Sequence, residues 1–154
     1  DQLKRADLVV FVPEGRNLVV DSQDGMIECR GVRSDVTATT TSGAVRLKGI
    51  IGRVAASTGS GPVTVLFSPH GSKQIQRVVS VSGKIQAHIP ENADIEVRVA
   101  THGEISSGFK MDLTGDTTGT SLHRGVAVIG SPGSELELMS DTGSIQIVRR
   151  LGTE

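Results

Sequence analysis

The sequence predicts an all-β protein, a single-domain right-handed parallel β-helix (β-solenoid) of about seven rungs of 18–22 residues that spans residues 1–154. Three observations predict it. Glycine recurs at a near-constant spacing, and apolar residues alternate with polar ones around each of these glycines. The chain also has 19 Gly but no Trp and no Tyr. A core without large aromatic side chains suits thin layers of strand filled by small and β-branched residues.

The repeat becomes visible when seven glycines are aligned, with gaps of 18, 18, 22, 20, 22 and 18 residues. They are Gly25, Gly43, Gly61, Gly83, Gly103, Gly125 and Gly143. A Ser or Thr stands three positions before five of them, which gives a Ser/Thr-x-x-Gly turn. The residues two and four positions after each glycine are mostly aliphatic, and this period of two is the signature of a strand. They are Ile27/Cys29, Val45/Leu47, Val63/Val65, Ile85/Ala87, Ile105/Ser107, Ala127/Ile129 and Ile145/Ile147.

A second strand is expected before six of the seven turns. In chain order these strands are Leu18–Val20, Val36–Ala38, Val54–Ala56, Val78–Val81, Ile95–Val99 and Leu136–Leu138. Each unit therefore consists of a strand, a sharp glycine turn, a strand and a looser turn. The unit at Gly125 fits worst, because Val126 and Val128 compete with Ala127 and Ile129 for the inward face, and we expect a bulge there.

Stacked rungs explain this pattern better than antiparallel hairpins, because stacking places equivalent residues in columns of like side chains. Hydroxyl side chains in such a column can hydrogen-bond along the stack. Glycine recurs where the backbone needs a positive φ or has no room for a Cβ atom. Gaps of 20 and 22 residues argue against a left-handed hexapeptide helix, and the calcium-binding nonapeptide repeat is absent.

Composition excludes several classes of function. The formal net charge is −1 and no basic block is present, which argues against a nucleic-acid partner. The chain contains no run of 18 apolar residues, so we expect no direct insertion of this segment into a membrane. The lone Cys29 cannot form an internal disulfide. The chain starts without Met and without the pattern of a signal peptide, so we expect a segment trimmed from a longer protein.

An ordered series of short motifs resembles a large family of bacterial β-strand-repeat domains, long of unknown function and described as putative adhesins. The series includes Val12-Pro-Glu-Gly15, Asp24-Gly-Met-Ile27, Ile89-Pro-Glu-Asn-Ala-Asp-Ile-Glu-Val97 and Leu136-Glu-Leu-Met-Ser-Asp-Thr-Gly-Ser-Ile-Gln-Ile147, over about residues 9 to 148. The resemblance implies a single-stranded β-helix from an exported or membrane-attached bacterial protein, located outside the cell (extracellular) or in the cell envelope. It implies no catalytic residues.

Histidines beside two turns are the candidates for a metal site. His102 and His123 precede successive turn glycines, and Asp141 occupies the matching position one rung on. The spacing of metal-ligand motifs is absent, and polar residues at exposed turns explain the same pattern. The sequence therefore predicts no metal-binding residue and no cofactor.

Two candidate nucleophiles are also weak. Ser121 lies near His123 in Gly119-Thr-Ser-Leu-His123, but the closing glycine of a hydrolase elbow is missing. Cys29 shares the inward face of Ile27, so we expect a buried and unreactive thiol. Gly59-Ser-Gly61-Pro-Val63 precedes a strand rather than a helix, so it is interpreted as a rung turn and not as a phosphate-binding loop. The sequence predicts no catalytic residue.

The outward positions carry the remaining candidate for binding. Arg30, Arg46 and Lys48 form a small basic patch over the first two rungs, either as a solvated face or as a site for an anionic ligand. No pair of carboxylates points to glycoside hydrolysis, and Trp and Tyr platforms for sugars are absent.

The leading hypothesis is a non-catalytic, adhesin-like binding or scaffold module of the cell envelope whose partner is a protein or a surface glycan. A self-assembling β-solenoid is the second hypothesis, because open edge strands invite self-association. The apolar run Leu8–Val12 lies near one edge, and Arg149 and Arg150, expected after the last strand, would discourage stacking at the other. A carbohydrate-active β-helix enzyme is the third.

Overall fold

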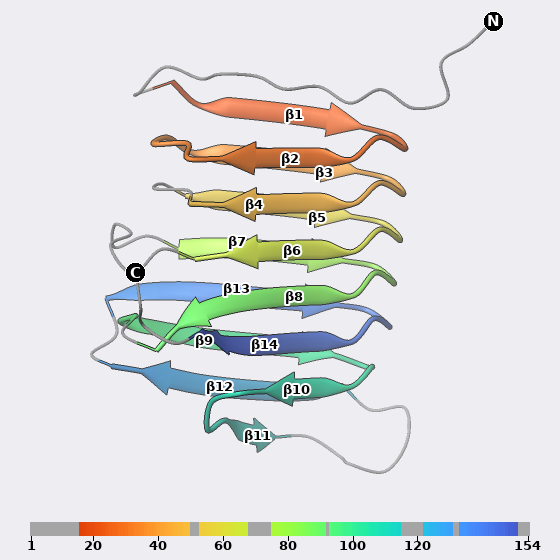
Figure 1. The fold of residues 1–154 in the computed structure, drawn as a ribbon. Helices are drawn as coiled ribbons and strands as arrows, with labels where there is room; N and C mark the ends of the chain where they lie inside the picture. The colour runs from red at the N-terminus through yellow and green to blue at the C-terminus, as the bar shows by residue number, and fades with distance from the viewer. Residues whose placement is uncertain are drawn as a thin grey trace, which may run out of the picture.

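The computed structural model describes residues 16–49, 53–67, 75–91, 93–114, 122–130 and 133–150. Two sheets face each other, and their strands stack as successive layers along one axis (Figure 1). The parallel β-solenoid that the sequence predicts is confirmed in these residues. No helix in the described ranges has the length and apolarity needed to cross a membrane.

Within the described residues, fourteen strands form the two sheets. Sheet A contains, in spatial order, β1 (Leu18–Ser22), β3 (Val36–Thr40), β5 (Val54–Thr58), β7 (Ile75–Ser80), β13 (Ser134–Ser140), β9 (Ile95–Thr101), β12 (His123–Ile129) and β11 (Asp112–Thr114). Sheet B contains, in spatial order, β10 (Ile105–Ser107), β14 (Ile145–Arg150), β8 (Ile85–Pro90), β6 (Val63–Leu66), β4 (Val45–Lys48) and β2 (Ile27–Arg30).

The core fills the space between the sheets with one layer of aliphatic side chains per rung. Val45, Leu47, Val63, Ile85 and Ile145 are fully buried, as the period of two predicts. Parallel pairing places each of them directly over its equivalent in the next rung, for example Val45 over Val63 and Val63 over Ile85. The predicted aliphatic columns are confirmed for these rungs.

The turn glycines are required by close packing of the rungs. The described glycines with positive φ are Gly31, Gly49 and Gly130, none of which is a turn glycine of the repeat. A Cβ atom on Gly61 would instead collide with the carbonyl oxygen of Gly43 in the rung before it. Glycine was expected in this column either for a positive φ or for lack of room for a Cβ atom. The second reason is the one that holds.

Hydroxyl side chains hold the turns together. The backbone N–H of Gly43 donates to Thr40 Oγ1 over 3.0 Å, and that hydroxyl donates to the carbonyl oxygen of Gln23 in the previous rung over 3.2 Å. The fifth unit has Ala100 where the repeat has a hydroxyl, and Thr101 replaces it by accepting the N–H of Gly103 over 2.9 Å. The hydroxyl column therefore runs along the stack as predicted, with a one-residue shift in this rung.

The order of the rungs differs from the order of the sequence. β13 pairs with β7 on one side and with β9 on the other, and β14 lies between β8 and β10. Figure 1 shows this last rung, in blue, between rungs that precede it in the chain. Arg149 and Arg150 therefore belong to a strand inside the stack, and the expectation that they cap its end is wrong. Right-handed coiling stays a prediction.

The predicted sixth unit is not a rung. Gly125 lies inside β12, which runs antiparallel to β9 in unbroken register from His123↔Thr101 to Ile129↔Ile95. The expected bulge is therefore also wrong. Leu122 stands three positions before Gly125, where the rung turns have a hydroxyl. Its side chain cannot accept the N–H of Gly125 as the hydroxyls accept the N–H of the turn glycines. Six two-strand rungs, not seven, are present in the described residues, and β12 with β11 extends sheet A beyond them.

Candidate functional site

The outer face of sheet B carries rows of side chains in register. Parallel pairing aligns Glu28 with Arg46 and Arg30 with Lys48, and Lys48 in turn with Leu66. Neighbouring strands lie about 4.8 Å apart, so these side chains form a regular array on a flat surface. A shallow depression of about 340 Å³ follows the rows across four strands. Its lining is Glu28, Cys29, Arg30, Arg46, Leu47, Lys48, Thr64, Leu66, Gln86 and His88.

The charge of this depression is positive. Arg30 forms an ion pair with Glu28 on the same strand. In the described part of the chain, no carboxylate lies within ion-pair distance of Arg46 or Lys48. These two cations remain available to an external anion. The basic patch expected from the sequence is thus assembled as predicted, on one face and in adjacent rungs.

His88 lines the same depression as the basic patch, in an environment that the sequence did not indicate. β14 inserts next to β8, which brings Arg150 close to His88. Partial burial, followed by the positive charge of Arg150, lowers the pKa of His88 below its ordinary value of 6.5. The imidazole is therefore neutral at pH 7 and offers one donor and one acceptor beside the cations.

On the outer face of sheet A, by contrast, two arginines are paired with carboxylates. Arg77 lies 3.0 Å from Glu137, and Arg98 lies 3.4 Å from Glu96 and 3.7 Å from Glu135. These pairs join β7, β13 and β9 on the solvent side. Within the described residues, each of these two arginines has a carboxylate partner, unlike Arg46 and Lys48 of sheet B.

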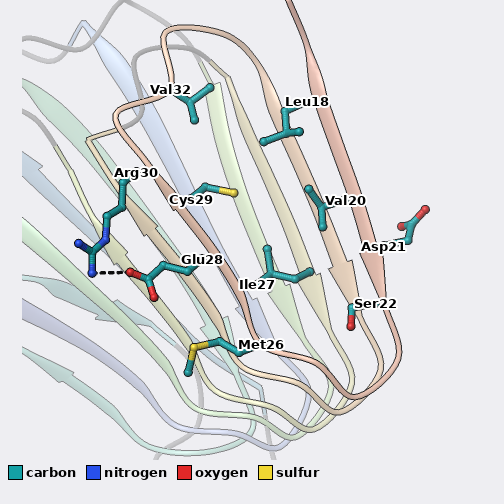
Figure 2. Close-up of a pocket in the computed structure, with 10 residues that line it drawn as sticks. All are labelled: Leu18, Val20, Asp21, Ser22, Met26, Ile27, Glu28, Cys29, Arg30 and Val32. Atoms are coloured by element: carbon teal, nitrogen blue, oxygen red, sulfur yellow. Dashed lines mark ion pairs between the residues drawn. The ribbon is translucent and has the colours of Figure 1, made fainter. Parts of the chain in front are cut away.

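A second hollow of about 200 Å³ lies at the end of the stack formed by β1 and β2. Figure 2 shows Leu18, Val20, Ile27, Cys29 and Val32 turned into the space between the two strands, whereas the Glu28–Arg30 ion pair lies on the outer side. The hollow therefore continues the core on its inner side, and Asp21, Ser22, Glu28 and Arg30 also line it. The run Leu8–Val12 lies outside the described residues.

Cys29 is a core residue, as the sequence predicts. It is 7% exposed. Burial, with a smaller effect from the charge of Glu28, raises the pKa of the thiol above 9.0. A protonated, buried thiol is a poor nucleophile and a poor metal ligand.

The two histidines beside turns have separate partners. His102 Nδ1 lies 3.3 Å from Asp141 Oδ1 and 3.0 Å from the carbonyl oxygen of Asp141. His123 Nδ1 lies 3.1 Å from the carbonyl oxygen of Gly103. Asp141, expected one rung beyond His123, instead lies beside His102, because β13 pairs with β9. No group of three or more potential metal ligands occurs in the described ranges.

Two further candidates from the sequence are Ser121 and the Gly59–Gly61 segment. Ser121, proposed beside His123, lies outside the described residues. The Gly59–Gly61 segment is a rung turn, in which Ser60 N–H donates to the carbonyl oxygen of Thr41 over 3.0 Å. The backbone groups of this turn are directed to the neighbouring rung, so the interpretation as a rung turn is confirmed.

Comparisons with known proteins agree with this architecture. No curated protein matches the chain. A crystal structure of a putative cell adhesion protein from Clostridium sporogenes ATCC 15579 is similar in fold, with a TM-score of 0.60 over 87% of this chain and 92% of that one, at 9% sequence identity. The family model described as Toastrack DUF4097 matches residues 3–148, nearly the whole chain. The chain therefore belongs to the Toastrack family, the kind of domain of unknown function that its repeat resembles.

Proposed function

We propose that this chain is a non-catalytic, adhesion-type binding module of the bacterial cell envelope, and that it binds an anionic surface polysaccharide through the outer face of sheet B. The observation that carries the proposal is the pair Arg46 and Lys48. Both are exposed on one strand, and the described residues give neither an ion-pair partner. A rigid row of cations matches a polymer with regularly spaced negative charges.

The stack of rungs makes the array rigid. Each strand of sheet B is hydrogen-bonded along its length to its neighbours, and the buried side chains beneath it, such as Leu47, are fully enclosed. Arg30, Arg46 and Lys48 therefore start from fixed backbone positions, which reduces the ordering cost of binding. The spread of these three cations over two adjacent rungs suits a polymer with several negative charges better than a small molecule.

A non-catalytic role fits the chemistry of the described residues. Cys29 is buried and protonated. Ser107 Oγ donates to the carbonyl oxygen of Phe109 within its own turn, over 2.9 Å. A nucleophile beside a general base would be needed for covalent catalysis, and neither of these groups has one. The fold shared with a putative cell adhesion protein supports display of a surface rather than turnover of a substrate.

The test compares two double variants that remove the same charge from opposite faces. Arg46→Gln/Lys48→Gln removes the unpaired cations of sheet B, and Arg77→Gln/Arg98→Gln removes two paired cations of sheet A. Binding to immobilised dextran sulfate, with uncharged dextran as the reference surface, is measured by biolayer interferometry at 50 and 200 mM NaCl. We expect the first variant to bind at least about 10-fold more weakly and the second to match the wild type, with affinity falling as salt rises.

Equal weakening by both variants would reduce the effect to net charge and overturn the assignment to sheet B. Wild-type protein that does not bind dextran sulfate would overturn the anionic ligand. The envelope location is tested separately, by fractionating the source cells and blotting each fraction with an antibody against the chain. A signal confined to the cytoplasmic fraction would contradict it.

A further inference from the structure

The C-terminal rung, β13 with β14, fills a slot between two rungs that precede it in the chain. One wall of the slot is β7 with β8, and the other is β9 with β10. β13 pairs in parallel with both β7 and β9, and β14 pairs in parallel with both β8 and β10. Without this rung, four strand edges would lose their partners (Figure 1).

The contacts of the inserted rung are extensive and complementary. Leu136, Leu138 and Ile145 are fully buried. On the solvent side, Arg77 of one wall pairs with Glu137, and Arg98 of the other wall lies 3.7 Å from Glu135.

Turn hydrogen bonds fix the rung to both walls. Asp141 N–H donates to the carbonyl oxygen of Ser80 over 3.1 Å, and His102 N–H donates to the carbonyl oxygen of Asp141 over 3.0 Å. The slot is therefore specific for this rung in register, shape and charge.

One short connection attaches the rung to the rest of the fold. β12 ends at Ile129 and β13 begins at Ser134, and these two strands lie on opposite sides of β9, about 9.6 Å apart, twice the usual strand spacing. Gly130 adopts a φ of 66°, and a Cβ atom there would collide with Asp94 and approach the carbonyl oxygen of Ala93 to 2.9 Å. Gly133 N–H donates to the carbonyl oxygen of Asp94 over 3.3 Å. The closed connection thus depends on a particular backbone conformation.

We propose that the C-terminal rung, residues 133–150, exchanges between two copies of this chain, so that the rung of each copy fills the slot of the other in a domain-swapped dimer. All contacts of the rung with its walls are non-covalent and would be identical in the dimer. Only the path of the chain between β12 and β13 would differ, and Gly130 would leave its closed conformation. Exchange of an identical element is a low-cost route to a dimer, and the conformational cost of the connection decides the balance.

The second copy is the occupant that fits the slot best. A foreign strand would have to match β7 and β9 at once, with leucines at the positions of Leu136 and Leu138 and carboxylates opposite Arg77 and Arg98. This mode differs from association through open edge strands, since the exchanged strands lie in the middle of the stack. It also does not require the proposed polysaccharide site, although a dimer would place two such faces in one particle and raise avidity.

A cross-linking experiment tests the exchange without altering the core. Two chains are made in a Cys29→Ala background, one with Arg77→Cys and the other, of different mass through a tag, with Glu137→Cys. Positions 77 and 137 are register partners on β7 and β13. The chains are unfolded together, refolded at high protein concentration and treated with a short bismaleimide. We expect a cross-linked heterodimer on denaturing gels.

The matched control replaces Arg77→Cys by Thr37→Cys. Thr37 is exposed on β3, which is not a neighbour of β13. Cross-linking of the 77/137 pair should exceed that of the 37/137 pair by at least about 10-fold, which is the advantage of enforced proximity. Equal yields from the two pairs would overturn the proposal.

A second pair of variants tests the role of the connection. Gly130→Val and Gly31→Val both place a β-branched residue at a positive φ, but Gly31 lies in a loose turn of the first rung with open space around it. Strain at Gly130 disfavours the closed connection alone. Light scattering after size-exclusion chromatography should give a several-fold larger dimer fraction for Gly130→Val than for Gly31→Val. The same dimer fraction in both would also overturn the proposal.

Discussion

Gly83 and Gly143 are 60 residues apart in the chain, yet a Cβ atom on Gly143 would collide with the carbonyl oxygen of Gly83. The same relationship repeats along the stack between Gly43 and Gly61 and between Gly61 and Gly83. The turns of adjacent rungs thus pack backbone against backbone. This contact is the tightest requirement that the fold places on the sequence.

Gly143→Ala should therefore be strongly destabilising. The new methyl group meets backbone atoms, which cannot move aside as a side chain can, and we expect a loss of about 3 kcal/mol or more in the free energy of unfolding. Urea denaturation followed by far-UV circular dichroism is the suitable measurement, because the chain has no Trp or Tyr. Gly31→Ala is the control, since it meets only the backbone cost of a positive φ, about 1–2 kcal/mol. A smaller loss at position 143 than at position 31 would contradict the close-packing argument.

Thr101→Val should expose the value of the hydroxyl column. Thr101 is fully buried; its Oγ1 donates to the carbonyl oxygen of Gly143 over 2.6 Å and accepts the N–H of Gly103 over 2.9 Å. Valine keeps the shape but leaves both backbone groups without that partner, which costs about 1–3 kcal/mol. The same substitution at exposed Thr39 should change the free energy of unfolding by less than about 0.5 kcal/mol. Equal urea midpoints for the two variants would count against a structural role of the column.

The repeat was predictable because its causes are local. Each rung needs a hydroxyl, a glycine and alternating aliphatic residues at fixed offsets, and these recur in the sequence from Ser22 to Gly143. The same regularity hides the order of the rungs. Ser80 would meet a similar hydroxyl in the next rung whether that residue were Thr101 or Ser140, so local sequence cannot distinguish insertion of the C-terminal rung from sequential stacking.

In the candidate site too, features set by the repeat spacing were predictable, and features set by the order of the rungs were not. Arg30 and Lys48 are 18 residues apart, one period of the repeat, and their register was predictable from the spacing alone. The approach of Arg150 to His88 depends on the inserted position of β14 and had no sequence signal. Gly125 was wrongly predicted to be a turn glycine. Alternating residues flank it as they flank the true turn glycines, but the hydroxyl three positions before it is missing.

Cys29 should react slowly with thiol reagents in the folded protein. Burial raises the pKa of its thiol, so the thiolate is scarce at pH 8 and access is restricted. The rate of reaction with Ellman's reagent should rise by at least about 100-fold in urea, in proportion to the opened population. Rapid labelling of the native protein, with the circular dichroism spectrum unchanged, would contradict the core assignment.

His88 should make the protein less stable at mildly acidic pH. Its pKa is lowered in the folded state, so the unfolded chain binds the proton more readily; the contribution of His88 is constant above pH 6.5 and is lost as pH falls through the lower folded pKa. His88→Gln removes this titration and keeps a polar side chain. The difference in unfolding free energy between wild type and variant should thus shift in favour of the variant between pH 7.5 and pH 5. Arg150→Gln should reduce that shift without abolishing it, because partial burial is the larger cause and the charge of Arg150 the smaller one. A difference that stays constant over this pH range would show that His88 has the same proton affinity in both states.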